Sequence, residues 1–236
     1  MKLLTTANTK TMKGEPFGYR SFIMHLAPAM SSGYNVCAFA SRGCAAACLN
    51  TAGRGVYPRV QAARRAKTIM FKEHPQKFMN MLVKDIRAAV RNATRNNLLP
   101  CIRLNGTSDV LWERIPVEVD NTRYDNIMSV FPDVQFYDYT QVPHRYNMPV
   151  NRCLMPDNYH LTFSLSESNN WAAQSAIENG MNVAVVFRHN LPHTFLGLPV
   201  VPGDVTDLRF LDPKGVIVGL TAKGKAKKDR SGFVMD

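Results

Sequence analysis

The chain has 236 residues, of which 45% are apolar and 20% are charged, a composition typical of a globular protein with one substantial core. Its formal net charge is +11 and its pI is about 9.6, and such an excess of cations favours an anionic partner, most often nucleic acid. The sequence has neither the apolar run that a membrane helix needs nor the apolar centre of a signal peptide. We therefore expect a cytoplasmic protein with no membrane partner.

The first β-rich run, 21–27, leads into a segment with three cysteines, Cys37, Cys44 and Cys48, in NVCAFASRGCAAACLN. A helix that begins near Gly43 would place Cys44 and Cys48 on one face, with Cys37 reaching back from the loop. Arg42 and the helix N-terminus would then favour the thiolate form. The spacing alone supports metal ligation and close helix packing equally, because free cysteine is also a common core residue.

The ligand set of such a metal site depends on the metal. A structural zinc ion would need a fourth ligand, for which the sequence offers His25, Cys101 and Cys153 in no recognisable spacing. An iron–sulfur cluster with one open iron would need none. Disulfides are not expected, because the cytoplasm keeps thiols reduced and the number of cysteines is five.

Two helices are predicted next, over 57–74 and 75–97. In the second helix apolar residues recur at three- and four-residue spacing, and Pro75 suits a first turn. The first helix is basic, and its candidate phosphate ligands are Arg59, Arg64, Arg65 and Lys67.

The run 101–105 ends in RLNGTSD. Arg103 lies within an apolar strand and must find a partner or a ligand there, because a buried guanidinium keeps its charge. Asp109 is the leading candidate for a carboxylate in a pocket, although this segment also has ordinary turn chemistry and Asp109 would suit a helix cap.

After a short helix over 124–131, the run 134–139 places Tyr137 and Tyr139 on one face of a strand. Such aromatic side chains beside a basic loop could stack on bases, although core packing is the commoner role. The run 160–165 ends near Glu167, which is available as a general acid or base. A helix over 170–179 and runs over 182–188 and 215–220 follow.

The segment 191–213 contains four prolines and is predicted to be irregular. Within it, 203–212 concentrates three acids and an arginine, which we interpret as an internally paired loop. The lysines that follow, Lys225, Lys227 and Lys228, either are solvated or contact phosphates. We expect one barrel-like domain over 1–222 and a basic tail with little to bury over 223–236.

The six β-rich runs are nearly continuous in apolar residues, as in parallel strands that are covered on both faces. Because helical segments separate several of them, the sequence predicts an α/β fold, either a partial (β/α)6-type barrel or an open parallel sheet. The functional residues should then lie at the carboxyl ends of the strands.

The cysteine triplet, RLNGTSD, FPDVQFYDYTQVPHR, YHLTFSLSES and GLTAKGKAKKD together resemble a poorly characterised family of tailed-bacteriophage proteins related to radical-SAM-like barrels. The resemblance implies that Cys37, Cys44 and Cys48 hold a [4Fe–4S] cluster whose open iron binds S-adenosylmethionine, with Asn105, Gly106 and Asp109 nearest that cofactor. The usual pattern is CxxxCxxC with an aromatic residue before the last cysteine, whereas here six and three residues intervene and Ala47 precedes Cys48. Zinc or no metal are the alternatives.

We therefore expect a phage enzyme of the host cytoplasm that acts on nucleic acid or a nucleotide, with Asp109 positioning cofactor or substrate and Glu167 or Tyr139 moving protons. One alternative is a transglycosylase-like or glycosidase-like base-modifying enzyme without iron, in which Asp109 attacks or stabilises the sugar. Another is a non-catalytic nucleic-acid-binding or host-inhibiting protein on a degenerate barrel.

Overall fold

The structure is a computed structural model that describes residues 1–5, 12–143, 145 and 155–236. In this part of the chain the main sheet has ten strands, with the bounds β1 (Leu4–Thr5), β2 (Tyr19–Met24), β3 (Leu99–Arg103), β6 (Gln135–Thr140), β7 (Tyr159–Ser164), β8 (Val183–Phe187), β9 (Thr194–Phe195), β10 (Leu198–Pro202), β11 (Ile217–Thr221) and β12 (Val234–Met235). A separate antiparallel hairpin consists of β4 (Val117–Val119) and β5 (Thr122–Tyr124).

The helices among the described residues lie mostly between the strands. The α-helices are α2 (Arg42–Ala47), α3 (Pro58–Glu73), α4 (Pro75–Thr94), α5 (Ile127–Val130) and α7 (Asn170–Glu178). Short 3₁₀ helices are η1 (Glu15–Phe17), η2 (Leu49–Thr51), η3 (Gly53–Val56), η4 (Trp112–Arg114), η5 (Arg209–Leu211) and η6 (Gly224–Lys228). None of the described helices combines the length and the apolar character that a membrane crossing requires.

From β2 to β11 the neighbouring parallel strands follow one another in chain order, whereas β10 and β9 continue the sheet in reverse order. The path runs β1-β2-β3-β6-β7-β8-β11-β10-β9, and the neighbours from β2 to β10 pair in parallel, whereas β1 and β9 pair in antiparallel fashion at the two ends. The predicted α/β class with a mostly parallel sheet is therefore confirmed. Because the path ends at β1 and at β9 in the described part of the chain, the sheet is open rather than a closed barrel.

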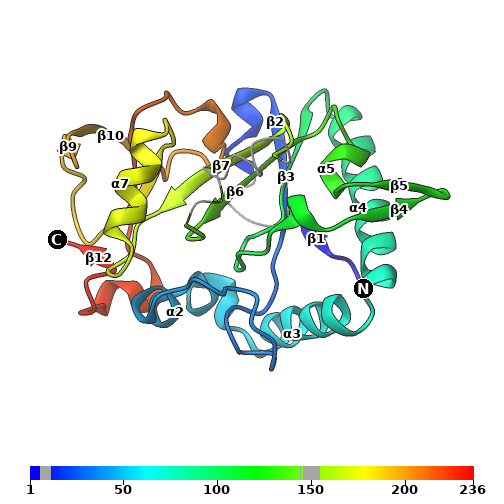
Figure 1. Cartoon of the computed structure of the whole chain (residues 1–236), viewed down its shortest axis with the longest axis horizontal. Helices are drawn as coiled ribbons and strands as arrows, with labels where there is room; N and C mark the ends of the chain where they lie inside the picture. Colours follow the sequence, from blue (N-terminus) through cyan, green and yellow to red (C-terminus); the bar gives the residue numbers. More distant parts are fainter. Residues whose placement is uncertain (6–11, 144, 146–154) are drawn as a thin grey trace.

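The helices cover one face of the sheet and one end of it (Figure 1). The apolar side of α4 packs on β1, β2 and β3, as its spacing predicts, and its residues from Phe78 to Ala93 belong to the largest core cluster. A second core cluster lies between α7 and the strands β7 and β8. Figure 1 shows α2 and α3 one after the other along the lower edge of the view, across the end where the parallel strands finish.

All six predicted strands are present, with ends that differ by a few residues, but several short elements differ from the prediction. The helix expected over 124–131 is limited to Ile127–Val130, because the residues before it pair with β4 as β5. The segment 191–213, predicted to be irregular, contributes β9 and β10 to the edge of the sheet. The sequence does not reveal these strands because β10 contains Pro199 and Pro202, and proline is depleted in strands and usually indicates a turn or loop.

The C-terminal segment is part of the fold. Strand β7 pairs with the first half of β8, at Val183 and Ala184, whereas β12 pairs with the second half, at Val186 and Phe187. Since β11 occupies the other edge of β8 along its whole length, β12 fills the space where β7 and β8 diverge. The segment 223–236 was expected to bury little, yet Phe233 and Val234 are buried among residues of α2 and η6.

Candidate functional site

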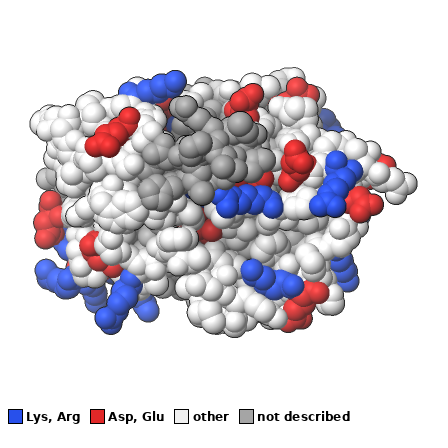
Figure 2. All heavy atoms as spheres, in the orientation of Figure 1, with Lys and Arg blue, Asp and Glu red and all other residues white. Residues whose placement is uncertain are grey.

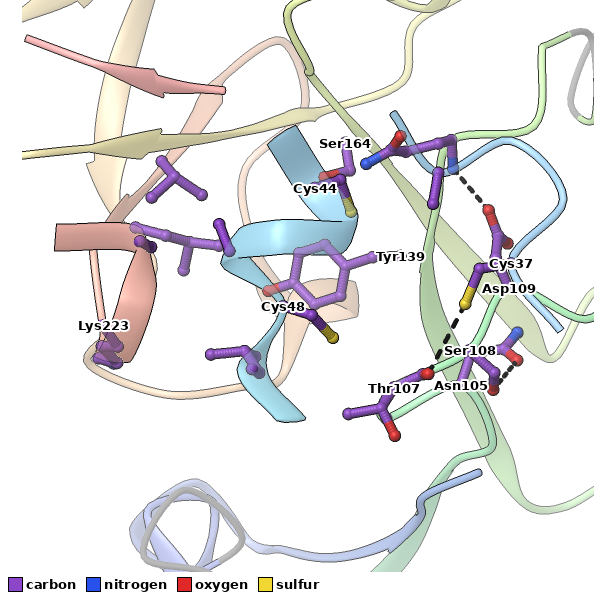
Figure 3. A pocket seen from close by; sticks show the side chains of 18 of the residues that line it. Cys37, Cys44, Cys48, Asn105, Thr107, Ser108, Asp109, Tyr139, Ser164 and Lys223 are labelled. Atoms are coloured by element: carbon purple, nitrogen blue, oxygen red, sulfur yellow. Dashed lines mark hydrogen bonds between the residues drawn. The ribbon is translucent and has the colours of Figure 1, made fainter. Parts of the chain in front are cut away.

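A pocket of about 220 Å³ lies where the parallel strands end, as the α/β topology predicts. Two groups of residues face each other across it. The strand wall consists of residues 103–109 and 139–141, which follow β3 and end β6. The helix wall consists of residues 41–49, around α2, and of residues 222–234, which pack against α2. Figure 3 shows both walls from close by.

The three clustered cysteines all line this pocket. Cys37 lies on the side of the strand wall, because Asp109 donates its backbone N–H to the Val36 carbonyl at 2.8 Å and the Cys37 thiol lies 3.7 Å from the Thr107 carbonyl. Cys44 is on α2, and Cys48 is the residue at which α2 ends. In Figure 3 the sulfur atoms of Cys44 and Cys48 lie on the side of α2 that faces Cys37. The triplet thus spans the two walls.

Local sequence explains why α2 begins where the prediction placed it. Ser41 is the N-cap, and its hydroxyl accepts a hydrogen bond from the Cys44 backbone N–H at 3.0 Å. Glu167 strengthens this start, because its carboxylate accepts hydrogen bonds from the Ser41 hydroxyl and from the Gly43 N–H, both at 2.7 Å. Glu167, predicted as an acid or base, is not among the residues that line the pocket. Its hydrogen bonds to Ser41 and Gly43 stabilise the start of α2, the helix that carries Cys44.

Burial disfavours the thiolate form of the three cysteines. Burial raises the pKa of Cys37 to about 11 and that of Cys44 to about 12, and a hydrogen bond from the Gln141 side chain only partly opposes the effect at Cys44. Burial also raises the pKa of Cys48, although Arg64 nearby lowers it in part. The expected thiolate form is therefore not favoured by the protein alone. A metal ion would supply the missing positive charge, since ligation deprotonates a thiol.

Asn105 organises the strand wall. Its side-chain oxygen accepts hydrogen bonds from the Ser108 hydroxyl, the Val110 N–H and the Trp112 indole, and its side-chain nitrogen donates to the Val110 carbonyl. The adjacent Gly106 is packed against β2, because a Cβ atom there would lie 2.6 Å from the Met24 carbonyl. Both residues line the pocket as predicted, but their contacts with the fold already account for their identity.

Asp109 lines the pocket and is held by a buried arginine. One carboxylate oxygen lies 2.9 Å from the Arg145 guanidinium, and the other accepts hydrogen bonds from the Gln141 N–H at 2.8 Å and the Thr140 hydroxyl at 3.2 Å. Arg145 also forms two hydrogen bonds with Glu113 and one with the Tyr159 hydroxyl. Burial raises the pKa of Asp109, whereas Arg145 lowers it. Both carboxylate oxygens are thus occupied within the protein.

Arg103 has the buried partner that the sequence requires. Its guanidinium lies 2.8 Å from Asp207 and 4.6 Å from the centre of the Tyr139 ring. Asp207 belongs to the loop 203–212, so the structure confirms that charges pair there, and Arg209 also pairs with Asp212 at 3.3 Å. Burial raises the pKa of Tyr139, so its hydroxyl keeps its proton. Tyr137, on the same face of β6, is fully buried.

The basic residues predicted on α3 divide into two groups. Arg59 and Arg65 are exposed. Arg64 instead donates a hydrogen bond to Asn50 close to Cys48, and Lys67 is buried and donates to the Leu3 carbonyl at 2.7 Å. The four residues are close together in the sequence, but an α-helix turns by about 100° per residue. Residues 64 and 67 therefore lie on the face of α3 that packs against the protein, whereas Arg59 and Arg65 lie on the exposed face.

The predicted fourth ligands do not join the triplet. Cys101 is buried beside the Ser21 hydroxyl, and neither it nor His25 lines the pocket. Cys153 lies outside the described residues. Across the part of the chain that the structure describes, no three His, Cys, Asp or Glu side chains form a ready-made site for a single metal ion.

Several residues of the pocket were not predicted from the sequence. Gln141 is buried in the strand wall, and Lys223, Ala226 and Phe233 belong to the helix wall. Strand alternation beyond Tyr139 could have identified Gln141, because residues two apart share a face. No local pattern could have identified the C-terminal residues, since they reach the pocket only through the pairing of β12 with β8.

Comparison with known proteins assigns a family and nothing finer. The family model described as gene product 88 matches residues 2–236, and the chain therefore belongs to this family, which is of phage type. No curated protein and no solved structure matches the chain.

Proposed function

We propose that this member of the gene product 88 family is an enzyme that uses an iron–sulfur cluster held by Cys37, Cys44 and Cys48, together with S-adenosylmethionine, to modify nucleic acid or a nucleotide. One observation carries the proposal: three thiols from two different walls line one pocket at the carboxyl ends of the parallel strands. This is also the arrangement that the radical-SAM-like resemblance implies.

The donor set fits a cluster better than a single zinc ion. Three thiols supply soft ligands, and thiolates are the usual ligands of iron–sulfur clusters. The described residues offer no compact single-ion site, whereas a cluster of several iron and sulfur atoms reaches across a wider gap between ligands. When bound, such a cluster would supply single electrons and one open iron to a ligand in the pocket.

The strand wall offers polar groups to that ligand. The Tyr139 hydroxyl and the Gln141 side-chain oxygen are buried and have no hydrogen-bond partner in the described part of the chain, and both residues line the pocket. A buried polar atom without a partner is costly. A polar ligand that accepts a hydrogen bond from Tyr139 and donates one to Gln141 would remove this cost.

The two other interpretations have less support from the geometry. An iron-free transglycosylase-like reaction needs a carboxylate that is free to attack, but both oxygens of Asp109 accept hydrogen bonds within the strand wall. A purely binding protein gives no reason for three thiols to converge on a pocket.

Anaerobic purification with iron and sulfide reconstitution tests the proposal. We expect wild-type protein to bind iron and acid-labile sulfide in equal amounts and to show the absorption of a cluster. The variants Cys44→Ala and Cys48→Ala should lose the iron while remaining folded. Cys101→Ala is the matched control, because Cys101 is buried away from the pocket, and it should keep the iron at some cost in stability.

Two results would contradict the proposal. Protein that stays folded but binds no iron or sulfide after reconstitution would exclude the cluster. Stoichiometric zinc without sulfide, lost on replacing Cys44, would establish a metal site of a different kind.

A further inference from the structure

We propose that the rim of the pocket binds single-stranded nucleic acid, with bases stacked on Phe39 and Tyr57 and phosphates held by Arg42, Arg54 and Arg59. The proposal specifies the substrate class of the proposed enzyme and rests on it for the placement of the reacting base, but the binding surface itself requires no cluster.

The charge of this segment is one-sided. From Pro16 to Lys72 the sequence contains eight Lys and Arg residues and no Asp or Glu. This stretch includes α2, η2, η3 and nearly all of α3, which together cover the carboxyl end of the sheet (Figure 1). Arg42, Arg54 and Arg59 are exposed. Without carboxylates in the same segment, their guanidinium groups are available to an anionic backbone.

Large apolar side chains are exposed on the same segment. The exposed fraction is 52% for Phe39, 50% for Leu49, 49% for Val56 and 58% for Tyr57. Leu49 also lines the pocket, and Phe39 directly precedes Ala40, which lines it too. Leu49 and Phe39 therefore lie at or near the pocket mouth, and Val56 belongs to η3, which contacts η2 and is directly followed by Tyr57. Exposed aromatic rings between arginines are the usual platform on which single-stranded bases stack.

The C-terminal turn adds cations on another side of the mouth. Helix η6 contacts α2 and η2, and Gly224 lies so close to residues 51 and 52 that a Cβ atom there would be 2.8 Å from the Ala52 side chain. Lys225, Lys227 and Lys228 are exposed on this turn, next to Lys223 in the pocket lining. Figure 2 shows Lys and Arg atoms gathered at the lower left, over the region where Figure 1 draws the C-terminal segment.

A single strand fits this surface better than a duplex does. A reacting base must leave its stack to enter a pocket, and a single strand has already lost its pairing partner. The stacking platform and the cations lie beside the pocket, so neighbouring nucleotides can stay on the rim. An anionic membrane would also attract cations and apolar side chains, and vesicle binding therefore belongs to the test.

Fluorescence anisotropy with labelled oligothymidine, oligouridine and a DNA duplex tests the surface, and vesicles that contain phosphatidylserine test the membrane alternative. We expect tighter binding of the single strands than of the duplex, with affinity that falls steeply as salt rises. Phe39→Ala with Tyr57→Ala should weaken single-strand binding about tenfold or more. The Tyr57 side chain makes no capping hydrogen bond to α3, so its loss spares the helix. Arg42, Arg54 and Arg59 changed together to Gln should reduce the salt dependence.

The matched controls lie elsewhere on the surface. Trp171 on α7 is 58% exposed, and Arg91 on α4 is exposed, so Trp171→Ala and Arg91→Gln should leave binding unchanged. Equal loss in the controls, tighter binding of duplex, or binding of vesicles without single strands would overturn the inference. All arms use protein before iron reconstitution. Single-strand binding without a cluster in any preparation would overturn the enzyme proposal alone, and a cluster without single-strand binding would overturn this inference alone.

Discussion

The two walls of the pocket are stabilised by different interactions. In the strand wall, the side-chain oxygens of Asn105 and Asp109 accept hydrogen bonds from neighbouring residues. In the helix wall, Cys44 packs against alanines, and α2 is held by its N-cap, by Glu167 and by the packing of the C-terminal segment. The first wall is fixed by polar contacts, whereas the second combines hydrogen bonds at the start of α2 with apolar packing.

This difference separates the residues that build the pocket from those that are free to act in it. Polar side chains at a strand end suggest a catalytic site, but most of those in the strand wall are satisfied within the protein. The thiols, by contrast, have weak partners only, as at the 3.7 Å contact of Cys37 with the Thr107 carbonyl. Chemistry is therefore expected from the triplet, with Tyr139 and Gln141 providing the polar contacts of the strand wall.

Replacing Arg145 with Met should give the largest effect, because it breaks the network behind the strand wall. The change leaves Asp109 and Glu113 buried without their common cation, and we expect a loss of about 3–5 kcal/mol in the free energy of unfolding. Urea denaturation measures it. The control Arg87→Met removes an exposed ion pair with Asp120 and should cost no more than ~1 kcal/mol. Similar costs for the two variants would show that polar contacts do not fix this wall.

Gly43→Ala tests the contribution of packing to the helix wall. A Cβ atom at this position would lie 2.2 Å from the Ser231 hydroxyl and 2.6 Å from the Phe233 Cβ. Although Ala favours a helix over Gly, overpacking should cost about 1–3 kcal/mol. Adding Ser231→Ala removes the nearest atom and should recover part of the loss in a double-mutant cycle. A neutral Gly43→Ala variant would mean that the C-terminal segment does not press on α2.

The sequence predicts the parallel strands well and the additions to the sheet poorly. The six predicted apolar runs correspond to β2, β3, β6, β7, β8 and β11 because strands covered on both faces have continuous apolar sequences. Strand β12 is only two residues long, Val234–Met235, and this is too short to show the apolar pattern of a strand. Its existence depends on the divergence of β7 from β8, which is a tertiary effect.

The candidate site, like the fold, could be predicted from the sequence only in part. The α/β topology predicts functional residues at the carboxyl ends of the strands, and the three cysteines do line a pocket there together with Arg103, Asp109 and Tyr139. The sequence did not predict which polar residues remain free. The contacts of Asp109 with Arg145 and of Glu167 with Ser41 each join residues that are more than 30 positions apart, and no local pattern contains such pairs.

Asp138 supports the strand wall from behind, and its titration offers a milder test. It accepts hydrogen bonds from the Asn105 N–H and the Tyr159 hydroxyl, and burial raises its pKa from 3.8 to about 7. The folded chain thus keeps a proton that the unfolded chain releases, so stability present at low pH is lost as the pH rises toward 7. Asp138→Asn cannot ionise. Its stability relative to wild type should rise over this window by at least the ~1.4 kcal/mol that one pKa unit represents.

The measurement is urea denaturation of both proteins at intervals between about pH 4 and pH 7. Asp120→Asn is the control, because Asp120 is exposed and its replacement should leave the pH profile parallel to that of wild type. If Asp138→Asn also follows the wild-type profile in parallel, Asp138 is ionised throughout, and the strand wall carries a buried negative charge.

Glu167→Gln should have the smallest effect, and it separates a structural carboxylate from a reacting one. The amide keeps one acceptor for the Ser41 hydroxyl or the Gly43 N–H but removes the negative charge at the start of α2. We expect a loss of about 0.5–1 kcal/mol by urea denaturation, with unchanged iron and sulfide content after reconstitution. The loss is small because packing against Phe233 and Val234 also holds α2. Unchanged stability with lost turnover would instead assign Glu167 to proton transfer, and the helix wall would then contribute more than its thiols.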